Sequence, residues 1–243
     1  MIANKNELLH EEVAELKRQL DAANAGFEEF ISTAAHNLRQ SLRDVLAFSQ
    51  LLAESQNAPD PEADLFVERI HNGSARIQSL LSDMVDYWAC CDIEPPSRTE
   101  MESVLGQALL AADLQIAERQ AVVTHDALPV VMGNFEVLTK VLHHLIRNGI
   151  EYSTNAAPHV HVSAQRSHAE WVISVHDNGP GIEAVFQNRV FLPFKRLHGN
   201  EHPGNGLGLA FCRKALAGQG GRIWVESTPG AGSTLYFTVP AAD

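Results

Sequence analysis

Apolar residues recur at helical spacing along the first fifty residues of the chain. They step by four and three, the heptad spacing with which helices bury a shared seam as a coiled coil. This seam comprises Leu9, Val13, Leu16, Leu20, Ala23, Phe27, Phe30 and Ala34. It continues at Leu38 and Leu42 in two consecutive steps of four, an insertion that locally unwinds a supercoil. We therefore expect one helix from about Glu7 to Glu54 that pairs with other helices.

A second helical segment follows a turn at residues 56–61, whose prolines cannot continue a helix. Its seam, again in steps of four and three, comprises Phe66, Ile70, Gly73, Ile77, Leu80, Met84 and Tyr87 or Trp88. Two antiparallel helices with one apolar seam each make an incomplete core. We expect a second copy of the chain to complete a four-helix bundle, so the predicted state is a homodimer. The alternative is a monomeric hairpin that lies on the following domain.

The pattern changes after Pro95 and Pro96, a stiff and extended pair. Helices are predicted over about 101–117, 136–152 and from near 206 to the glycine cluster at 218–221. Strands are predicted over about 121–124, 159–165, 171–176, 222–227 and 233–239. The predicted fold class is therefore α+β. It has a coiled coil and helical hairpin over residues 1–91, a linker over 92–98 and a mixed helix-and-sheet domain over 99–243.

Composition narrows the class of protein. A net charge of −12 argues against a nucleic-acid binder, because no basic stripe is present for the phosphate backbone. No apolar run approaches the roughly 20 residues that span a bilayer, so direct membrane insertion is not expected. The three cysteines, with Cys90 and Cys91 adjacent, fit neither a disulfide framework nor a zinc site. A reduced, cytoplasmic compartment fits this cysteine usage best.

Three segments of the second domain carry candidate nucleotide chemistry. The first begins at Asp177, directly after a predicted strand, where Gly179 and Gly181 let the backbone approach a flat ligand. A carboxylate at that place can accept a hydrogen bond from an exocyclic amine. The second precedes a predicted helix and comprises Gly204, Gly206, Leu207 and Gly208. Its free backbone N–H groups and the helix dipole suit a polyphosphate.

The third segment lies on the helix predicted over 136–152. Its polar side chains share one helical face at i, i+4, i+7 and i+8, and they are His144, Asn148, Glu151 and Tyr152. Asn148 offers an amide oxygen of the kind that Mg²⁺ accepts as a ligand. Taken singly, each of the three segments is explained equally well as a turn, a helix cap or a solvated face.

His36 lies two residues from both Ala34 and Leu38. At about 100° per residue, its imidazole therefore points away from the buried seam. Alone, such a residue is most simply a solvated histidine on a helix.

In this order and with this spacing, the three segments resemble the ATP-binding domain of sensor histidine kinases, and the stretch around His36 resembles their phosphoacceptor box. The closing segments, residues 191–198 and 221–227, are most similar to the kinase modules behind bacterial phytochromes. The resemblance covers nearly the whole chain. It implies an α/β sandwich of the histidine kinase, gyrase and chaperone type, with ATP held between helices and a lid at about residues 197–203.

The resemblance also implies roles for individual residues. His36 would accept the γ-phosphoryl group of ATP and pass it to an aspartate of a response-regulator receiver domain. Asn148 would bind Mg²⁺, and Asp177 would bind the adenine amine. Gly179 and Gly181 would shape the adenine pocket, and Tyr152 would line the nucleotide site. The remaining candidates would lie at the phosphates: Gly204, Gly206, Leu207 and Gly208 around them, and Arg196 and His198 as further contacts. The resemblance further implies an upstream sensor domain.

Five positions depart from the family pattern. Asn37 and Ser41 replace the usual acidic residue and proline, while His144 and Glu151 replace an asparagine and a basic residue. An amide at position 37 cannot act as a base near neutral pH, and general-base help is worth about 10²–10⁴-fold, so slow autophosphorylation is predicted. Gln40 stands where the family often orients a hydrolytic water, which leaves phosphatase activity open.

Two alternatives follow from these departures. The chain is either an active kinase or a dimeric phosphotransfer and regulator-binding scaffold that binds nucleotide without using it efficiently. An ATPase of the gyrase and chaperone type is a remote third option, because the stretch around His36 has no place in it.

Overall fold

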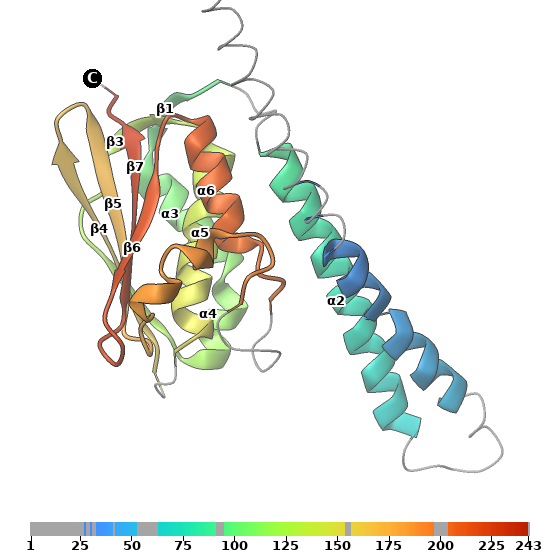
Figure 1. Ribbon diagram of the computed structural model, residues 1–243. Coiled ribbons are helices and arrows are strands. Elements are labelled where there is room, and N and C mark those ends of the chain that lie inside the picture. Colours follow the sequence, from blue (N-terminus) through green and yellow to red (C-terminus); the bar gives the residue numbers. More distant parts are fainter. Residues whose placement is uncertain are drawn as a thin grey trace, which may run out of the picture. The chain divides into compact units, whose positions relative to one another are not determined.

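The computed structural model describes residues 27, 30, 33–40, 42–52, 63–90, 95–153, 157–196 and 204–242 (Figure 1). The chain divides into two compact units, Met1–Leu80 and Leu81–Asp243, and each is described by itself. Among the described helices, none combines the length and the apolar composition needed to cross a membrane.

The described residues of the first unit form two helices. Every described residue between 27 and 52 is helical, and α2 (Ala63–Ala89) begins in the same unit. The rings of Phe48 and Phe66 stack with centroids 6.2 Å apart and so join the two helices. This agrees with the predicted hairpin. The predicted turn at 56–61 and most of the predicted coiled-coil seam lie outside the described residues.

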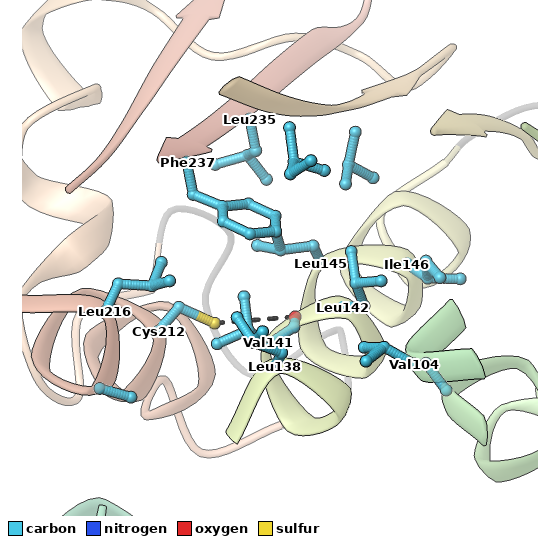
Figure 2. Close-up of a cluster of buried hydrophobic side chains, with 14 of the residues drawn as sticks. Val104, Leu138, Val141, Leu142, Leu145, Ile146, Cys212, Leu216, Leu235 and Phe237 are labelled. Atoms are coloured by element: carbon cyan, nitrogen blue, oxygen red, sulfur yellow. Dashed lines mark hydrogen bonds between the residues drawn. The ribbon is translucent and has the colours of Figure 1, made fainter. Parts of the chain in front are cut away.

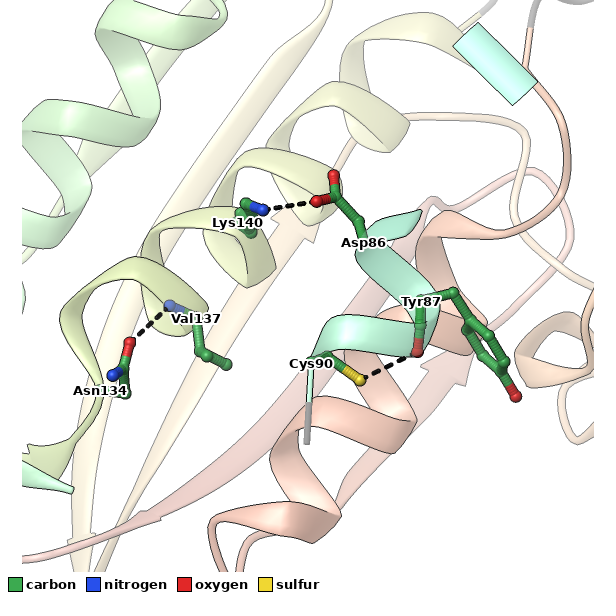
Figure 3. Close-up of polar contacts among 6 residues, drawn as sticks. All are labelled: Asp86, Tyr87, Cys90, Asn134, Val137 and Lys140. Atoms are coloured by element: carbon green, nitrogen blue, oxygen red, sulfur yellow. Dashed lines mark hydrogen bonds and ion pairs between the residues drawn. The ribbon is translucent and has the colours of Figure 1, made fainter. Parts of the chain in front are cut away.

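The last two turns of α2 belong to the second unit. Lys140 Nζ donates to Asp86 Oδ1 at 2.6 Å, and Cys90 Sγ donates to the Tyr87 carbonyl oxygen at 3.2 Å (Figure 3). Lys214 Nζ donates to the same carbonyl oxygen at 2.8 Å. These contacts explain why the second unit begins at Leu81, before the linker expected at 92–98. The end of that expected linker is part of strand β1.

A five-stranded sheet forms one layer of the second unit. Its strands are β2 (Val122–His125), β4 (His159–Ser167), β5 (Glu170–Asp177), β6 (Ile223–Ser227) and β7 (Ser233–Pro240). They lie in the order β2-β4-β5-β7-β6, with β2 and β4 parallel and the other pairs antiparallel. A separate antiparallel pair joins β1 (Ser97–Glu100) to β3 (Val130–Gly133). All five strands of the large sheet were predicted, whereas the two strands of the small sheet were not.

Helices cover one face of the large sheet (Figure 1). They are α3 (Met101–Ala111), α4 (Asp113–Arg119), α5 (Phe135–Glu151) and α6 (Gly208–Gly218), with short 3-10 turns η1 (Ala184–Phe186) and η2 (Arg189–Phe191) before α6. The single helix expected over 101–117 is broken at Ala112, where φ is −100° and ψ is 2°. The Ala112 N–H is shared between the carbonyl oxygens of Ala108 and Leu109, which ends α3.

The core lies between α5 and the sheet (Figure 2). Leu138, Leu142 and Leu145 on the inner side of α5 are fully buried, and Phe237 faces them from β7. The start of α5 is capped by Asn134, whose Oδ1 accepts from the Val137 N–H at 3.1 Å (Figure 3). The predicted helix hairpin followed by an α/β sandwich is therefore confirmed. A capped and buried α5 also gives the residues at its far end a fixed position.

Candidate functional site

A cleft in the second unit opens between the end of α5, the end of β5 and the segment before α6. It has about 900 Å³ of empty space, open solvent included. Most of the predicted binding residues line it, namely Asn148, Glu151, Tyr152, Asp177, Gly181, Arg196, Gly204, Gly206 and Gly208. Residues that the sequence did not single out also line it, among them Arg147, Lys195, Asn205, Ile182 and Ser233. Segments distant in sequence thus meet at one site.

Asp177 is the last residue of β5, and only one of its two carboxylate oxygens accepts hydrogen bonds from the described residues. Its Oδ1 accepts from the Gly179 N–H at 2.8 Å and from the Ser233 N–H at 3.3 Å. Among the residues that the structure describes, none donates to Oδ2. Burial raises the pKa of Asp177, and the two N–H donors oppose this shift. The result is a fixed hydrogen-bond acceptor on the cleft wall.

Asn148 reaches the same cleft because α5 packs closely on the sheet at the next residue. A Cβ on Gly149 would lie 2.9 Å from Val160 Cγ2 and 3.1 Å from Asp177 Cβ, so a glycine there permits the close approach. No hydrogen bond joins the Asn148 side-chain amide to another described residue. Its oxygen is thus available to a ligand a short way from Asp177.

Arg147 and Glu151 form a pair on the last turn of α5. Arg147 Nε lies 3.8 Å from Glu151 Oε2, and the side chains are 23% and 16% exposed. Burial raises the pKa of Glu151, while the positive charges of Arg147, Arg196 and Arg119 lower it. Burial also raises the pKa of Tyr152, which follows Glu151 in the chain and lines the same cleft. The negative charge of Glu151 is therefore balanced by neighbouring arginines.

The glycine-rich segment is shaped by backbone that favours glycine. Gly204 and Gly206 have φ of +117° and +70°, and the Gly206 carbonyl oxygen accepts from the Phe194 N–H at 2.9 Å. Asn205 Nδ2 donates to Asp83 Oδ2 at 2.8 Å, which ties the segment to the end of α2. Among the described residues, no side chain caps the start of α6 at Leu207. The first N–H groups of α6 are therefore left for a ligand at the cleft.

Two predicted residues support the cleft from behind without lining it. Gly179 holds Asp177, as described, and a Cβ there would lie 2.7 Å from Asp177 Oδ1. Leu207 is buried and its carbonyl oxygen accepts from the Phe211 N–H at 2.8 Å. His198 lies outside the described residues.

His144 is also placed away from the cleft. Its ring packs on Phe211 of α6, with centroids 5.2 Å apart, and its Nδ1 has no hydrogen-bond partner among the described residues. Burial, assisted by the charge of Arg147, lowers the pKa of His144 to about 3. A Cβ on Gly208 would lie 3.0 Å from that Nδ1. The imidazole is thus a neutral group that packs against the start of α6. It lies one turn of α5 before Asn148, which lines the cleft.

His36 is exposed on the first helix of the first unit, while Ala34 is buried. This agrees with the outward direction that the seam predicted. The side chain of Gln40 is engaged one turn further on, since its Oε1 accepts from Arg43 at 2.5 Å and its Nε2 donates to Asp44 at 3.4 Å. Ser41 lies outside the described residues.

Comparison with known families and proteins gives consistent results for both units. Residues 28–87 match the His Kinase A (phospho-acceptor) domain, and residues 133–243 match the histidine kinase-, DNA gyrase B- and HSP90-like ATPase. Cyanobacterial phytochrome A from Nostoc sp. is 38% identical over 234 residues, which are 95% of this chain and 30% of that protein. The adaptive-response sensory kinase SasA from Prochlorococcus marinus is 30% identical over 253 residues, with 100% of this chain and 64% of that protein covered.

The chain thus spans less than a third of the phytochrome's length and less than two thirds of that of SasA. Among solved structures, Acinetobacter baumannii histidine kinase AdeS matches with a TM-score of 0.67 and 19% identity, over 86% of this chain and 98% of that chain. Histidine kinase ThkA in complex with response regulator protein TrrA matches with a TM-score of 0.68 and 19% identity. The match covers 88% of this chain and 61% of that chain. These two structures show the shared fold.

Proposed function

Because this chain has the catalytic core of a sensor histidine kinase, a phospho-acceptor domain followed by an ATPase domain, we propose that it autophosphorylates His36 with ATP. One observation carries the proposal. Asp177 Oδ2 and the Asn148 amide oxygen accept no hydrogen bond from the residues that the structure describes, and they lie on the wall of a cleft that cationic side chains also line. A cleft with these groups suits a nucleotide with its metal ion.

The cleft residues fit both ends of the nucleotide. Asp177 Oδ2 accepts a hydrogen bond from the exocyclic amine of adenine, because Oδ1 is already occupied by two backbone N–H groups. The uncapped N–H groups at the start of α6 bind phosphate oxygens. The Asn148 oxygen would hold Mg²⁺, which when bound would offset the charge on those oxygens.

The chemical step is phosphoryl transfer to nitrogen. An imidazole nitrogen of His36 attacks the γ-phosphorus, the P–N bond forms, and the bond to the β–γ bridging oxygen breaks, so that ADP leaves. Asn37 accepts a hydrogen bond from the other ring nitrogen through its amide oxygen, but it cannot take the proton. That proton passes to water, which makes the transfer slower than with a carboxylate at position 37.

The phosphoryl group then passes from His36 to an aspartate of a response-regulator receiver domain. The ThkA structure, solved with a response regulator protein, and the phospho-acceptor match support this partner and a homodimer. The match covers 30% of the phytochrome relative, so the rest of that protein leaves room for a sensor domain. Phosphatase activity on the partner would require Gln40 to release Arg43 and Asp44.

Labelling with γ-labelled ATP and Mg²⁺ tests this function. We expect an acid-labile label on the wild-type chain that is lost in His36→Gln. The control is His71→Gln, which removes an exposed histidine of α2 and should keep the label. Absence of label at saturating ATP, or equal label in His36→Gln, counts against the kinase.

The amide at position 37 favours a second candidate, a scaffold that binds nucleotide without efficient transfer. Asn37→Glu separates the two functions, since it supplies the missing base. A wild-type chain that binds ATP but takes no label, while Asn37→Glu is labelled, identifies the scaffold. A wild-type label that rises by about 10²-fold in Asn37→Glu identifies a slow kinase.

A further inference from the structure

The cleft has an acidic side chain where the resemblance expects a basic one. Glu151 lines the cleft, and an unopposed carboxylate there would repel the phosphates of a nucleotide. The chain must therefore supply positive charge from another position if the proposed nucleotide binding holds. The following inference rests on that proposed function.

Arg147 lines the same cleft one helical turn before Glu151. Its Nε is buried and has no hydrogen-bond partner among the described residues. The nearest carboxylate oxygen, Glu151 Oε2, is 3.8 Å away, which is beyond hydrogen-bond range. The guanidinium is thus balanced in charge but leaves buried hydrogen-bonding capacity unused, a costly condition unless a ligand completes it.

Two carboxylates accompany Arg147. Its positive charge lowers the pKa of both Glu151 and Asp83, while burial raises both. Glu151 Oε2 lies 3.8 Å from Arg147 Nε, and Glu151 stands at i+4 on the same helix. This spacing directs the arginine side chain along α5 toward the end of the helix where Asn148 lies.

We propose that Arg147 is the phosphate-binding cation of this site, in place of the basic residue that Glu151 displaces, and that Glu151 positions its guanidinium. An arginine fork binds two phosphate oxygens at once through parallel N–H donors. The phosphate oxygens complete the hydrogen bonds that Glu151 leaves unmade.

Two other cations line the cleft, but the backbone that carries them differs. Lys195 and Arg196 follow Phe194 in a segment without regular secondary structure. Arg147 instead projects from a helix whose preceding residues, Leu145 and Ile146, are fully buried. A side chain on such a fixed support holds its donors in place before the ligand arrives, which favours binding.

Binding of MgATP and of adenosine to the full chain, measured by calorimetry, tests this assignment. We expect Arg147→Met to weaken MgATP roughly ten- to a hundredfold, as for the loss of a charge-assisted hydrogen bond, and to leave adenosine unchanged. Arg166→Met is the matched control, because Arg166 lies over the Trp171 ring outside the cleft. It should bind both ligands as the wild type does.

A relocated charge tests the role of Glu151. In the double variant Arg147→Met with Glu151→Lys, the cation stands one turn later, and MgATP affinity should recover most of the loss. Equal MgATP affinity in Arg147→Met and wild type overturns the assignment. So does equal weakening of adenosine and MgATP, which would mark a structural role. A wild-type chain that binds no MgATP refutes the proposed function itself, which is a separate outcome.

Discussion

At the scale of single residues, the cleft is marked by polar atoms that find no hydrogen-bond partner among the described residues. Asp177 has one oxygen fixed by two backbone donors and the other open, and Arg147 has a buried Nε without a partner among the described residues. Buried or half-buried polar groups usually find partners in the fold. Their concentration in one cleft is therefore a physical sign of a polar ligand.

The two oxygens of Asp177 predict the effect of a small change there. In Asp177→Asn, the amide oxygen keeps the two backbone N–H groups, so the NH₂ group replaces Oδ2 and faces the adenine amine, donor against donor. We expect MgATP affinity to fall roughly ten- to a hundredfold in calorimetry. Asp126→Asn, on an exposed loop, is the control and should have no effect. Unchanged affinity in Asp177→Asn would remove the carboxylate from base recognition.

His144 predicts a pH dependence of stability. Its pKa is about 3 in the folded chain against an ordinary 6.5, so between these values the unfolded state binds a proton that the folded state does not. Stability is therefore lost as pH falls from 6.5 toward 3. Between pH 7.5 and pH 5 the loss from this one residue is about 2 kcal/mol.

Urea unfolding of the full chain at both pH values measures this loss. His144→Asn, the residue type that the family resemblance expects there, should unfold with a pH-dependent loss smaller by about that amount. His125→Gln alters an exposed histidine and should leave the wild-type dependence in place. Identical pH dependence in His144→Asn and wild type would show that the ring is not kept neutral by burial.

At the scale of elements, the turn between β6 and β7 supports the end of β5. The Gly230 N–H donates to the Pro180 carbonyl oxygen at 2.7 Å, and Ser227 Oγ donates to the Gly232 carbonyl oxygen at 2.8 Å. A Cβ on Gly232 would lie 2.0 Å from the Asp177 carbonyl oxygen, so this turn and Asp177 are in direct backbone contact. The turn is thus part of the support for base recognition.

Two glycines of this turn make a matched pair. Both have positive φ, +82° at Gly230 and +85° at Gly232, but a Cβ on Gly230 meets nothing within 4 Å. Gly230→Ala should cost about 1–2 kcal/mol of unfolding free energy from backbone strain alone. Gly232→Ala should cost more and should also weaken MgATP, because Asp177 must shift. Equal costs in urea unfolding, with equal MgATP affinity, would show that the turn does not position Asp177.

The same scale shows what the sequence could predict. The helix α5 and the long strands β4, β5 and β7 were predictable because their apolar periodicity extends over eight or more residues. The pair β1 and β3 was missed because β1, Ser97–Glu100, contains no apolar residue from which a strand could be recognised, so β3 had no visible partner. No glycine or proline marks the break at Ala112. Three residues of the four-residue face predicted on α5 line the cleft, while the ring of the fourth, His144, packs on Phe211 of α6. Arg147 also lines the cleft, and the sequence feature that could have indicated it is its i+4 spacing to Glu151.

At the scale of the whole molecule, the first unit carries apolar side chains that its own fold leaves exposed. Leu42 and Leu46 lie at i and i+4 on the first helix and are 48% and 58% exposed, while Phe48 faces Phe66 inside the hairpin. A stripe of this kind on a two-helix unit is what a second copy would cover. We therefore expect a homodimer with a mass of about twice the 26.6 kDa chain.

Light scattering after size exclusion tests this. Leu46→Glu should give a monomer, because a charge on the stripe is costly to bury in a dimer but is solvated on a single hairpin. Leu114→Glu, at a residue 77% exposed on α4 of the other unit, should remain dimeric. Since the cleft lies wholly in the second unit, the monomeric variant should still bind MgATP as the wild type does. A dimer that survives Leu46→Glu would mean that another surface joins the two copies, whereas loss of MgATP binding with the dimer would mean that the nucleotide site depends on assembly.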